Sequence, residues 1–177
     1  MSKPRFRRAL LLGCCAVLQA LPAHAEVTAG DLQIMGRALS FLEKPLSGEV
    51  RVGIVYSADN PQSAHDADDL QRLLGEGLRV GNVVLKPVMV SLVQLPQANV
   101  DVLFLTAGLG EQATPVGVAS RTRRLPCITS DLSQVQTGRC AVGVSSEPTV
   151  EILVNRAAAL ANGTTFSTLF RMLINEI

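Results

Sequence analysis

The cysteines are the residues best able to carry covalent or metal chemistry in this chain. Two lie near the N-terminus, and the other two, Cys127 and Cys140, lie in the C-terminal half. In an oxidising compartment Cys127 and Cys140 predict a disulfide, which would close a loop of about 14 residues and stabilise the fold by about 3 kcal/mol. The pattern leaves open whether this bridge is structural or a redox switch. Two cysteines and a distant histidine, His65, do not make a four-ligand set, so we expect no metal site.

A glycine pair raises the question of a dinucleotide-binding site. Gly108 and Gly110, with Ala113, lie between an apolar run and a helical pattern, and Asp131 follows about twenty residues on, as in the dinucleotide fingerprint. Glu111, however, places negative charge where a pyrophosphate would lie. An exported protein also has little access to nicotinamide cofactors. We therefore expect a tight turn at these glycines and no cofactor.

Other motifs give no catalytic constellation. The sequence has no G-x-S-x-G elbow and no H-E-x-x-H motif. His65 and Asp69 share a helix face, but a single such pair is a weak metal or proton-transfer site. Aromatic residues make up 3% of the chain, there is no Trp, and the net charge is +1, so we expect no nucleic-acid partner. We predict a protein that is not an enzyme and has no catalytic residues.

The first 25 residues have the features of a secretory signal peptide. Four basic residues precede a short apolar run, and Ala23-His24-Ala25 forms a small-x-small cleavage site, so we predict cleavage after Ala25 and a periplasmic location. The alternatives are a lipoprotein acylated at Cys14 and a retained membrane anchor, both disfavoured by the short apolar run. Cleavage would leave 152 of the 177 residues, with a net charge of −3 and no integral membrane segment.

Hydrophobic periodicity predicts one α/β domain over residues 26–177. Strand and helix patterns alternate, and the run 101–106 is apolar enough to be central in a sheet covered on both faces. We predict a three-layer sandwich with a mostly parallel sheet flanked by helices. The predicted strands span 49–56, 83–93, 101–106, 127–129, 139–144 and 149–154. The predicted helices span 28–44, 63–75, 111–123, a short turn at 131–138, 155–161 and a closing helix at about 166–174. We expect Thr28, with Asp31, to cap the first helix, and Ser130 and Asp131 to cap the short turn.

Several short motifs give the chain a family resemblance. Residues 125–131 read Leu-Pro-Cys-Ile-Thr-Ser-Asp, 138–144 read Gly-Arg-Cys-Ala-Val-Gly-Val, and 150–155 read Val-Glu-Ile-Leu-Val-Asn. An Ala-rich helix and Phe-Ser-Thr-Leu-Phe-Arg-Met-Leu at 166–173 follow. With the 101–105 strand and Ala38, Phe41 and Pro45, these motifs resemble the YfiR/HmsC-like family over most of the mature chain.

This resemblance implies an exported regulator without catalytic activity. The best-known type represses an inner-membrane diguanylate cyclase by binding its periplasmic sensor region, which lowers cyclic-di-GMP and biofilm output. Disulfides in the family are tied to stability and to redox-dependent release, whereas only one bridge is available here. We expect the partner contacts at Thr164, Thr165 and Phe166, which follow a break at Gly163. A homodimer remains open.

A small solute-binding protein of a transport system is the alternative function. The mature chain has the size of one lobe of a two-lobed binding protein. In open α/β sheets, ligands bind outside the carboxyl ends of the strands. The residues expected there are Ser57, Thr106, Gly108, Ser130 and Asp131.

Overall fold

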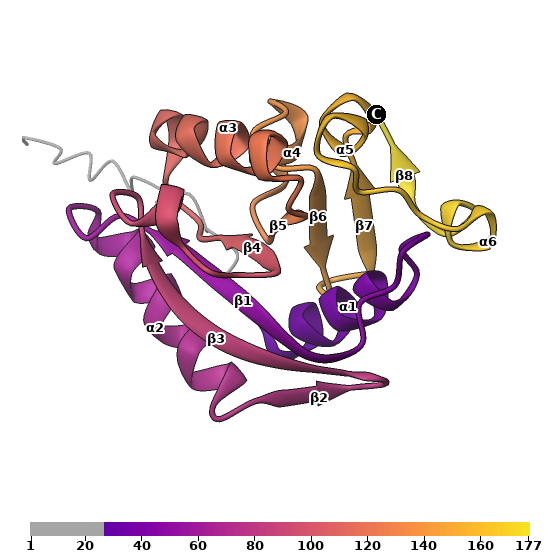
Figure 1. The fold of residues 1–177 in the computed structure, drawn as a ribbon, viewed down its shortest axis with the longest axis horizontal. Coiled ribbons are helices and arrows are strands. Elements are labelled where there is room, and N and C mark those ends of the chain that lie inside the picture. Colours follow the sequence, from indigo (N-terminus) through magenta and orange to yellow (C-terminus); the bar gives the residue numbers. More distant parts are fainter. Residues whose placement is uncertain (1–26) are drawn as a thin grey trace, which may run out of the picture.

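The computed structural model describes residues 27–177, so the predicted signal peptide lies outside the described residues. The described chain is an α/β domain with one eight-stranded sheet (Figure 1). Its strand order is β2-β3-β1-β4-β5-β6-β7-β8. The strands are β1 (Gly48–Tyr56), β2 (Leu78–Val80), β3 (Val83–Ser91), β4 (Val102–Leu105), β5 (Cys127–Thr129), β6 (Val142–Ser145), β7 (Glu151–Val154) and β8 (Asn175–Glu176).

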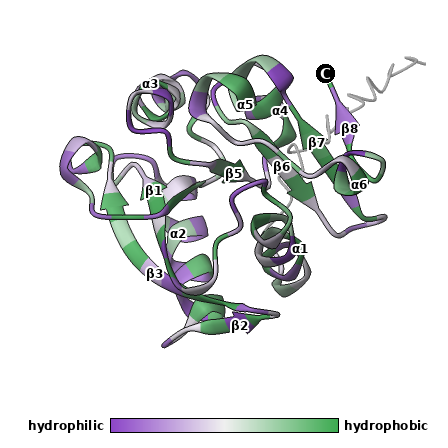
Figure 2. Cartoon of the chain, turned by 45° about the vertical axis from the view of Figure 1, so that its right-hand side comes forward, coloured by the Kyte–Doolittle hydropathy of each residue, from purple (hydrophilic) through white to green (hydrophobic). Residues whose placement is uncertain are grey.

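The sheet is mostly parallel, as predicted. Strands β3, β1, β4, β5 and β6 run in one direction, so their carboxyl ends meet at one edge. Strand β2 forms an antiparallel hairpin with β3, β7 is antiparallel to β6, and β8 pairs in parallel with β7. Figure 2 shows that β7 is largely hydrophobic whereas the edge strand β8 is hydrophilic.

Helices cover both faces of the sheet, which confirms the predicted sandwich. On one face α1 (Ala29–Ser40) and α2 (Pro61–Leu74) pack on a core that includes Ile54 and Phe104. On the other face the 3-10 turns η1 (Leu95–Gln97) and η2 (Gly110–Ala113) and helix α3 (Thr114–Arg123) cover a core that includes Val55 and Leu105. The short helices α4 (Leu132–Gln136), α5 (Arg156–Asn162) and α6 (Thr168–Arg171) complete the fold (Figure 1).

Polar caps set the start of most helices. Thr28 and Asp31 form the expected reciprocal capping box at α1. Asp131 caps α4, as predicted, and Asn155 caps α5. The second helix begins earlier than predicted, because Asn60 accepts from the N–H groups of Gln62 and Ser63.

Two predicted helices are shorter in the structure because the segments beside them pair with each other. Helix α1 ends at Ser40 rather than at residue 44, since the Glu43 N–H donates to the Thr165 carbonyl and the Ser167 N–H donates to the Phe41 carbonyl. The same pairing keeps Phe166 extended, so the closing helix predicted at about 166–174 is wrong at both ends and correct only at residues 168–171. The chain forms only α6 there and then adds β8 to the sheet.

Other element boundaries differ by a few residues. The sequence did not predict β2, whose Val80 packs close to Gly36 of α1. The predicted strand at 139–144 begins at Val142, because the Arg139 and Cys140 N–H groups both donate to the Gln134 carbonyl. These donors close the turn after α4 instead of joining the sheet. The helix predicted from residue 111 starts with the 3-10 turn η2.

Candidate functional site

The disulfide is formed between Cys127 and Cys140, as predicted. Cys127 begins β5 and Cys140 precedes β6, and their Cα atoms are 5.1 Å apart. Both residues are buried in the core under α3. A thiol from solution therefore cannot reach the bridge while the fold is closed, which favours a structural role over a redox switch.

In the turn after β4, which contains Gly108 and Gly110, side chains from the start of α2 occupy the space beside Gly108. Gly108 and Gly110 both have positive φ angles, which suit glycine in a tight turn. The Asn60 side chain donates to the Gly108 carbonyl at 2.9 Å, and Gln62 lies against the Gly108 Cα. Glu111 is ion-paired with Arg139. This arrangement supports the tight-turn prediction for the motif.

The five residues predicted for solute binding lie at the carboxyl edge of β1, β4 and β5, but all of them except Ser130 use polar groups in hydrogen bonds within the fold. The Ser57 N–H donates to the Ser63 hydroxyl, which is hydrogen-bonded to Thr106 Oγ1 at 2.7 Å. Asp131 accepts from the Ser133 N–H as a helix cap. The buried Ser130 hydroxyl has no hydrogen-bond partner among the described residues.

A buried carboxylate at this edge was not expected from the sequence. Asp66 of α2 accepts a hydrogen bond from the Ala107 N–H at 2.7 Å and another from the Val27 N–H. Burial raises the pKa of this carboxyl above its ordinary value, while the two backbone donors act in the opposite direction. Asp66 thus joins the N-terminal end of the described chain to the β4 edge. Asp66 belongs to a run of aspartates in α2, and nothing in the sequence of that run distinguishes the buried Asp66 from the exposed Asp68.

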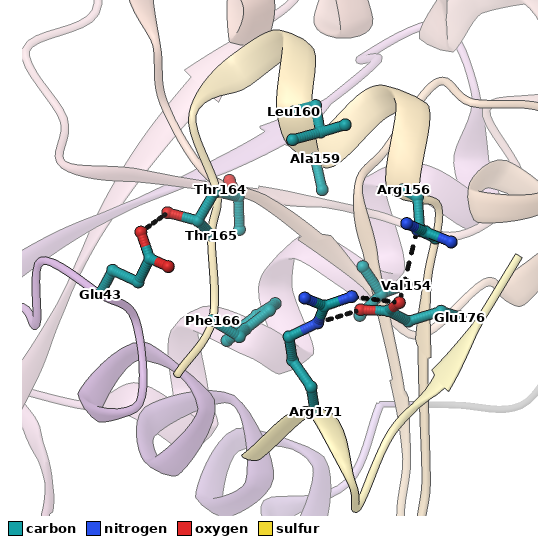
Figure 3. A pocket seen from close by; sticks show the side chains of 10 residues that line it. All are labelled: Glu43, Val154, Arg156, Ala159, Leu160, Thr164, Thr165, Phe166, Arg171 and Glu176. Atoms are coloured by element: carbon teal, nitrogen blue, oxygen red, sulfur yellow. Dashed lines mark hydrogen bonds and ion pairs between the residues drawn. The ribbon is translucent and has the colours of Figure 1, made fainter. Parts of the chain in front are cut away.

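A pocket lies beside the edge strand β8, near the C-terminus of the chain. This pocket has a volume of about 130 Å³, and residues from the α1–β1 loop, α5, α6 and β8 surround it (Figure 3). All three residues predicted as partner contacts line it. Its lining consists of Glu43, Val154, Arg156, Ala159, Leu160, Thr164, Thr165, Phe166, Arg171 and Glu176.

The predicted contact residues have different roles in this pocket. Thr165 Oγ1 donates to Glu43 at 3.0 Å and thereby links the chain after α5 to the end of α1. Phe166 is buried and packs against Phe170 with ring centroids 5.1 Å apart. Thr164 is buried too, and its hydroxyl has no hydrogen-bond partner among the described residues. Thr165 is therefore the best exposed of the three.

Charged groups on the other side of the pocket neutralise one another. The Arg171 guanidinium donates two hydrogen bonds to Glu176, each 2.9 Å long, and Arg156 approaches the same carboxylate at 3.5 Å (Figure 3). The Arg171 hydrogen bonds hold the pKa of Glu176 below its ordinary value. These contacts anchor the edge strand β8, so the pocket wall is a fixed part of the fold.

Apolar side chains project into solvent beside this pocket. Leu169, Met172 and Leu173, on α6 and the turn after it, are each 76% exposed, and Phe41 next to them is 45% exposed. Phe41 stacks on Phe170 with ring centroids 4.8 Å apart, which joins the α1 end to α6. We call these four exposed residues the C-terminal apolar patch. The sequence predicted a closing helix at about 166–174 but did not predict that Leu169 and Leu173 are exposed.

The described residues contain no group of three or more potential metal-ligating side chains. Within residues 27–177, no helix combines the length and the apolar character needed to cross a membrane.

Comparison with known proteins supports the fold and adds no function. Neither a protein-family model nor a curated protein matches the sequence. A solved structure of a conserved domain protein from Vibrio cholerae O1 biovar El Tor superposes with a TM-score of 0.56 at 12% sequence identity. The match covers 83% of this chain and 60% of that protein, so the chain spans less than two thirds of its length. At this identity the similarity concerns the architecture alone.

Proposed function

We propose that this protein is an exported regulatory binding protein that contacts the outer-facing domain of a membrane signalling enzyme. The observation that carries the proposal is the C-terminal apolar patch. Leu169, Met172 and Leu173 expose apolar surface side by side on one short segment, and such clusters on a folded domain mark interaction sites. Glu43 and Arg171, which line the neighbouring pocket, are close in sequence to Phe41 and Met172 and supply polar groups of the kind found at the edges of protein interfaces.

The resemblance to the YfiR/HmsC-like family supports a specific partner. We infer that the protein represses an inner-membrane diguanylate cyclase through its periplasmic sensor region and is not itself an enzyme. The Cys127–Cys140 bridge is consistent with the oxidising periplasm. In this proposal the partner covers the patch and Thr165, while the buried Thr164 and Phe166 support the surface from below.

Membrane capture together with nucleotide measurement tests the proposal. A deletion strain is complemented with the native gene, with Leu173→Asp or with Val150→Asp, and cyclic-di-GMP is measured in each strain. Leu173 and Val150 are 76% and 69% exposed, so neither substitution disturbs the core, and Val150 lies outside the patch. We expect Leu173→Asp to weaken capture of the cyclase at least tenfold and to raise cyclic-di-GMP to the level of the deletion strain. Val150→Asp should behave as the native protein.

Two results would overturn the proposal. One is a deletion strain with unchanged cyclic-di-GMP and no cyclase among the captured membrane proteins. The other is equal repression by the native protein and the Leu173→Asp variant.

Export is tested separately by mass spectrometry of the mature protein. We propose that the mature chain begins at Glu26, after cleavage behind Ala25. A mature N-terminus at an acylated Cys14 would contradict this and would place the protein on a membrane surface instead.

A further inference from the structure

A second apolar surface lies on α3, on a different side of the molecule from α6 (Figure 1). It is a groove between α3 and the η1 turn, with a volume of about 560 Å³. This volume falls within the range of about 300–1,000 Å³ that is typical of small-molecule sites. The groove is lined by Leu92, Leu95, Pro96, Thr114, Pro115, Val118, Ala119, Thr122 and Arg123.

The lining of the groove is unusual for a helix face in contact with water. Val118 is 50% exposed at the centre of the α3 face, and its neighbours Pro115 and Ala119 are also uncharged. A water-exposed helix face normally carries charged side chains. Here the groove-lining residues include one cation, Arg123, and no carboxylate.

Arg123 presents a preoriented positive charge at the groove. Its guanidinium donates to the Leu95 carbonyl at 3.1 Å and to the Ala98 carbonyl, which hold the side chain against η1. These two bonds leave further N–H donors of the guanidinium free to bind another acceptor. Because the carbonyls are neutral, the full positive charge of Arg123 remains uncompensated by them.

Two more arginines increase the positive charge at this end of α3. Arg121 and Arg124 are exposed, and none of the ion pairs within residues 27–177 involves Arg121, Arg123 or Arg124. The C-terminal end of a helix carries about half a negative charge, which explains why cations are favourable there. The Arg121 side chain extends beside Gly117, which does not line the groove, but the full positive charge of Arg123 alone exceeds that partial charge. The helix end therefore keeps a net positive potential beside an apolar groove.

We propose that this groove binds a single-chain amphiphile with an anionic head, such as a fatty-acid carboxylate. The alkyl chain lies along Val118, Ala119 and Pro96, and the head group accepts hydrogen bonds from Arg123. The concave shape favours this occupant over a flat bilayer, which would contact protruding side chains instead. The charge at the rim favours an anionic head over a neutral or cationic one. This site is independent of the C-terminal apolar patch and goes beyond the proposed regulatory function.

Isothermal titration with three twelve-carbon ligands tests the inference on the native protein. Dodecanoate, dodecanol and dodecyltrimethylammonium share an alkyl chain and differ in the charge of the head group. The two ionic ligands are used below their micellar concentrations, and dodecanol is used below its solubility limit. We expect saturable micromolar binding of dodecanoate and at least tenfold weaker binding of the other two ligands. Dodecanoate should also raise the melting temperature of the protein by several degrees at saturation.

Matched valine variants locate the site. Val118→Asp places a negative charge in the groove and should weaken dodecanoate binding at least tenfold. Val150→Asp makes the same change at an exposed valine elsewhere and should leave binding unchanged. Melting temperatures of both variants verify that they are folded. The head-group comparison on native protein keeps the test decisive even if Val118→Asp is unstable.

Four outcomes would overturn the inference. The first is no saturable binding of dodecanoate, and the second is equal binding of the cationic ligand. The third is binding to anionic phospholipid vesicles without binding of free dodecanoate, which would make the face a membrane contact. The fourth is a concentration-dependent dimer that Val118→Asp disrupts in the absence of dodecanoate binding, which would assign the groove to a second copy of the chain.

Discussion

At the scale of single residues, the pKa of Asp66 is raised and that of Asp101 is lowered, so the ionisation of these two carboxyl groups affects the stability of the fold in opposite directions. Asp66 is buried and bonded to backbone N–H groups, and its pKa is raised mainly by desolvation. Asp101 forms a two-point contact with the Arg51 guanidinium, at 3.0 and 2.8 Å, and those hydrogen bonds lower its pKa. A raised pKa means that the folded state holds the proton more tightly than the unfolded state, and a lowered pKa means the reverse.

Because the pKa of Asp66 is raised in the folded state, we predict that the free energy of unfolding falls as the pH rises above the ordinary aspartate pKa of about 3.9. We expect Asp66→Asn, which keeps an oxygen acceptor for Ala107, to remove this loss and to be within about 1 kcal/mol of the native chain at pH 7. Asp66→Ala should cost about 1–3 kcal/mol, because it leaves a buried N–H unpaired. Urea unfolding between pH 4 and 8 measures both effects. The exposed Asp68→Asn is the control, and an Asp66→Asn variant with the native pH dependence would contradict the prediction.

For Asp101, the stabilisation is present above the ordinary pKa and is lost as the pH falls through the lowered one. We expect Asp101→Asn to reduce the free energy of unfolding by about 1 kcal/mol at pH 7, since the pair is partly exposed and screened by solvent. The difference from the native chain should disappear in acid. Glu49→Gln, which removes an exposed partner of Lys86 at 3.8 Å, should change stability at neither pH. A difference for Asp101→Asn that persists in strong acid would exclude the ion pair as its cause.

At the scale of elements, the disulfide fastens the short α4 unit to the sheet. It joins Cys127 at the start of β5 to Cys140, two residues before β6, so the intervening α4 is closed into a loop. The bridge lies under α3, and the Gly143 Cα of β6 lies against Leu132 and Val135 of α4. The loop that the bridge closes is short and well packed. Loss of the disulfide should therefore loosen β5 and β6 rather than the β1–β3 half of the sheet.

We expect the double variant Cys127→Ala/Cys140→Ala to lose about 3 kcal/mol of unfolding free energy. Denaturant titration of the variant and of the native chain gives this difference. Native protein treated with reductant without denaturant should keep its bridge, because both sulfurs are buried. Rapid reduction of the folded native protein would show that the bridge is accessible and would revive the redox-switch alternative.

The packing of α1 on the hairpin β2–β3 depends on a missing side chain. A Cβ on Gly36 would come within 2.6 Å of the Val80 side chain, so Gly36→Ala forces the helix away from β2. We expect a cost of about 1–3 kcal/mol despite the better helix propensity of alanine, measured by urea unfolding. Arg37→Ala, at the next and exposed position, is the control and should be close to neutral. A Gly36→Ala variant more stable than the native chain would mean that β2 moves freely to accommodate the methyl group.

The sequence predicted correctly the elements that depend on residues close to one another in the chain. It did not predict the elements whose boundaries are set by hydrogen bonds between distant segments. Caps at Thr28 and Asp131 and the strand at 127–129 were predicted correctly, because capping side chains and β-branched runs act within a few residues. The closing helix failed because the contacts of Phe41 with Ser167 are tertiary. The C-terminal apolar patch could not be predicted, since periodicity identifies an apolar face and not whether anything covers it.

At the scale of the whole molecule, the C-terminal apolar patch and the groove at α3 lie in different parts of the described fold. The C-terminal apolar patch lies at the β8 edge, while the groove lies over the face that α3 covers. Substitutions this far apart, with no shared contacts, act independently. We therefore expect a substitution in one surface to leave the other unchanged.

Because the two surfaces lie apart, we predict that each of two variants loses one binding property and keeps the other. Leu173→Asp should lose capture of the membrane partner and keep native dodecanoate affinity, whereas Val118→Asp should do the opposite. Capture from membranes and isothermal titration, performed on the same two protein preparations, measure both properties. Loss of both activities in either variant, with an unchanged melting temperature, would show that the surfaces form one site.

The hydrogen bonds between the start of α1 and the end of β6 also affect when the chain can fold. Thr28 Oγ1 lies 2.8 Å from the Ser146 hydroxyl, and Asp31 accepts from the Ser146 N–H at 2.7 Å, across 118 and 115 positions of sequence. The ribosome makes the N-terminal helix first, but its docking partner only near the end of translation. Until Ser146 emerges, α1 lacks its binding surface on β6. For the export proposed above, such a delay would be an advantage, because a chain that folded early could not pass through a narrow membrane channel.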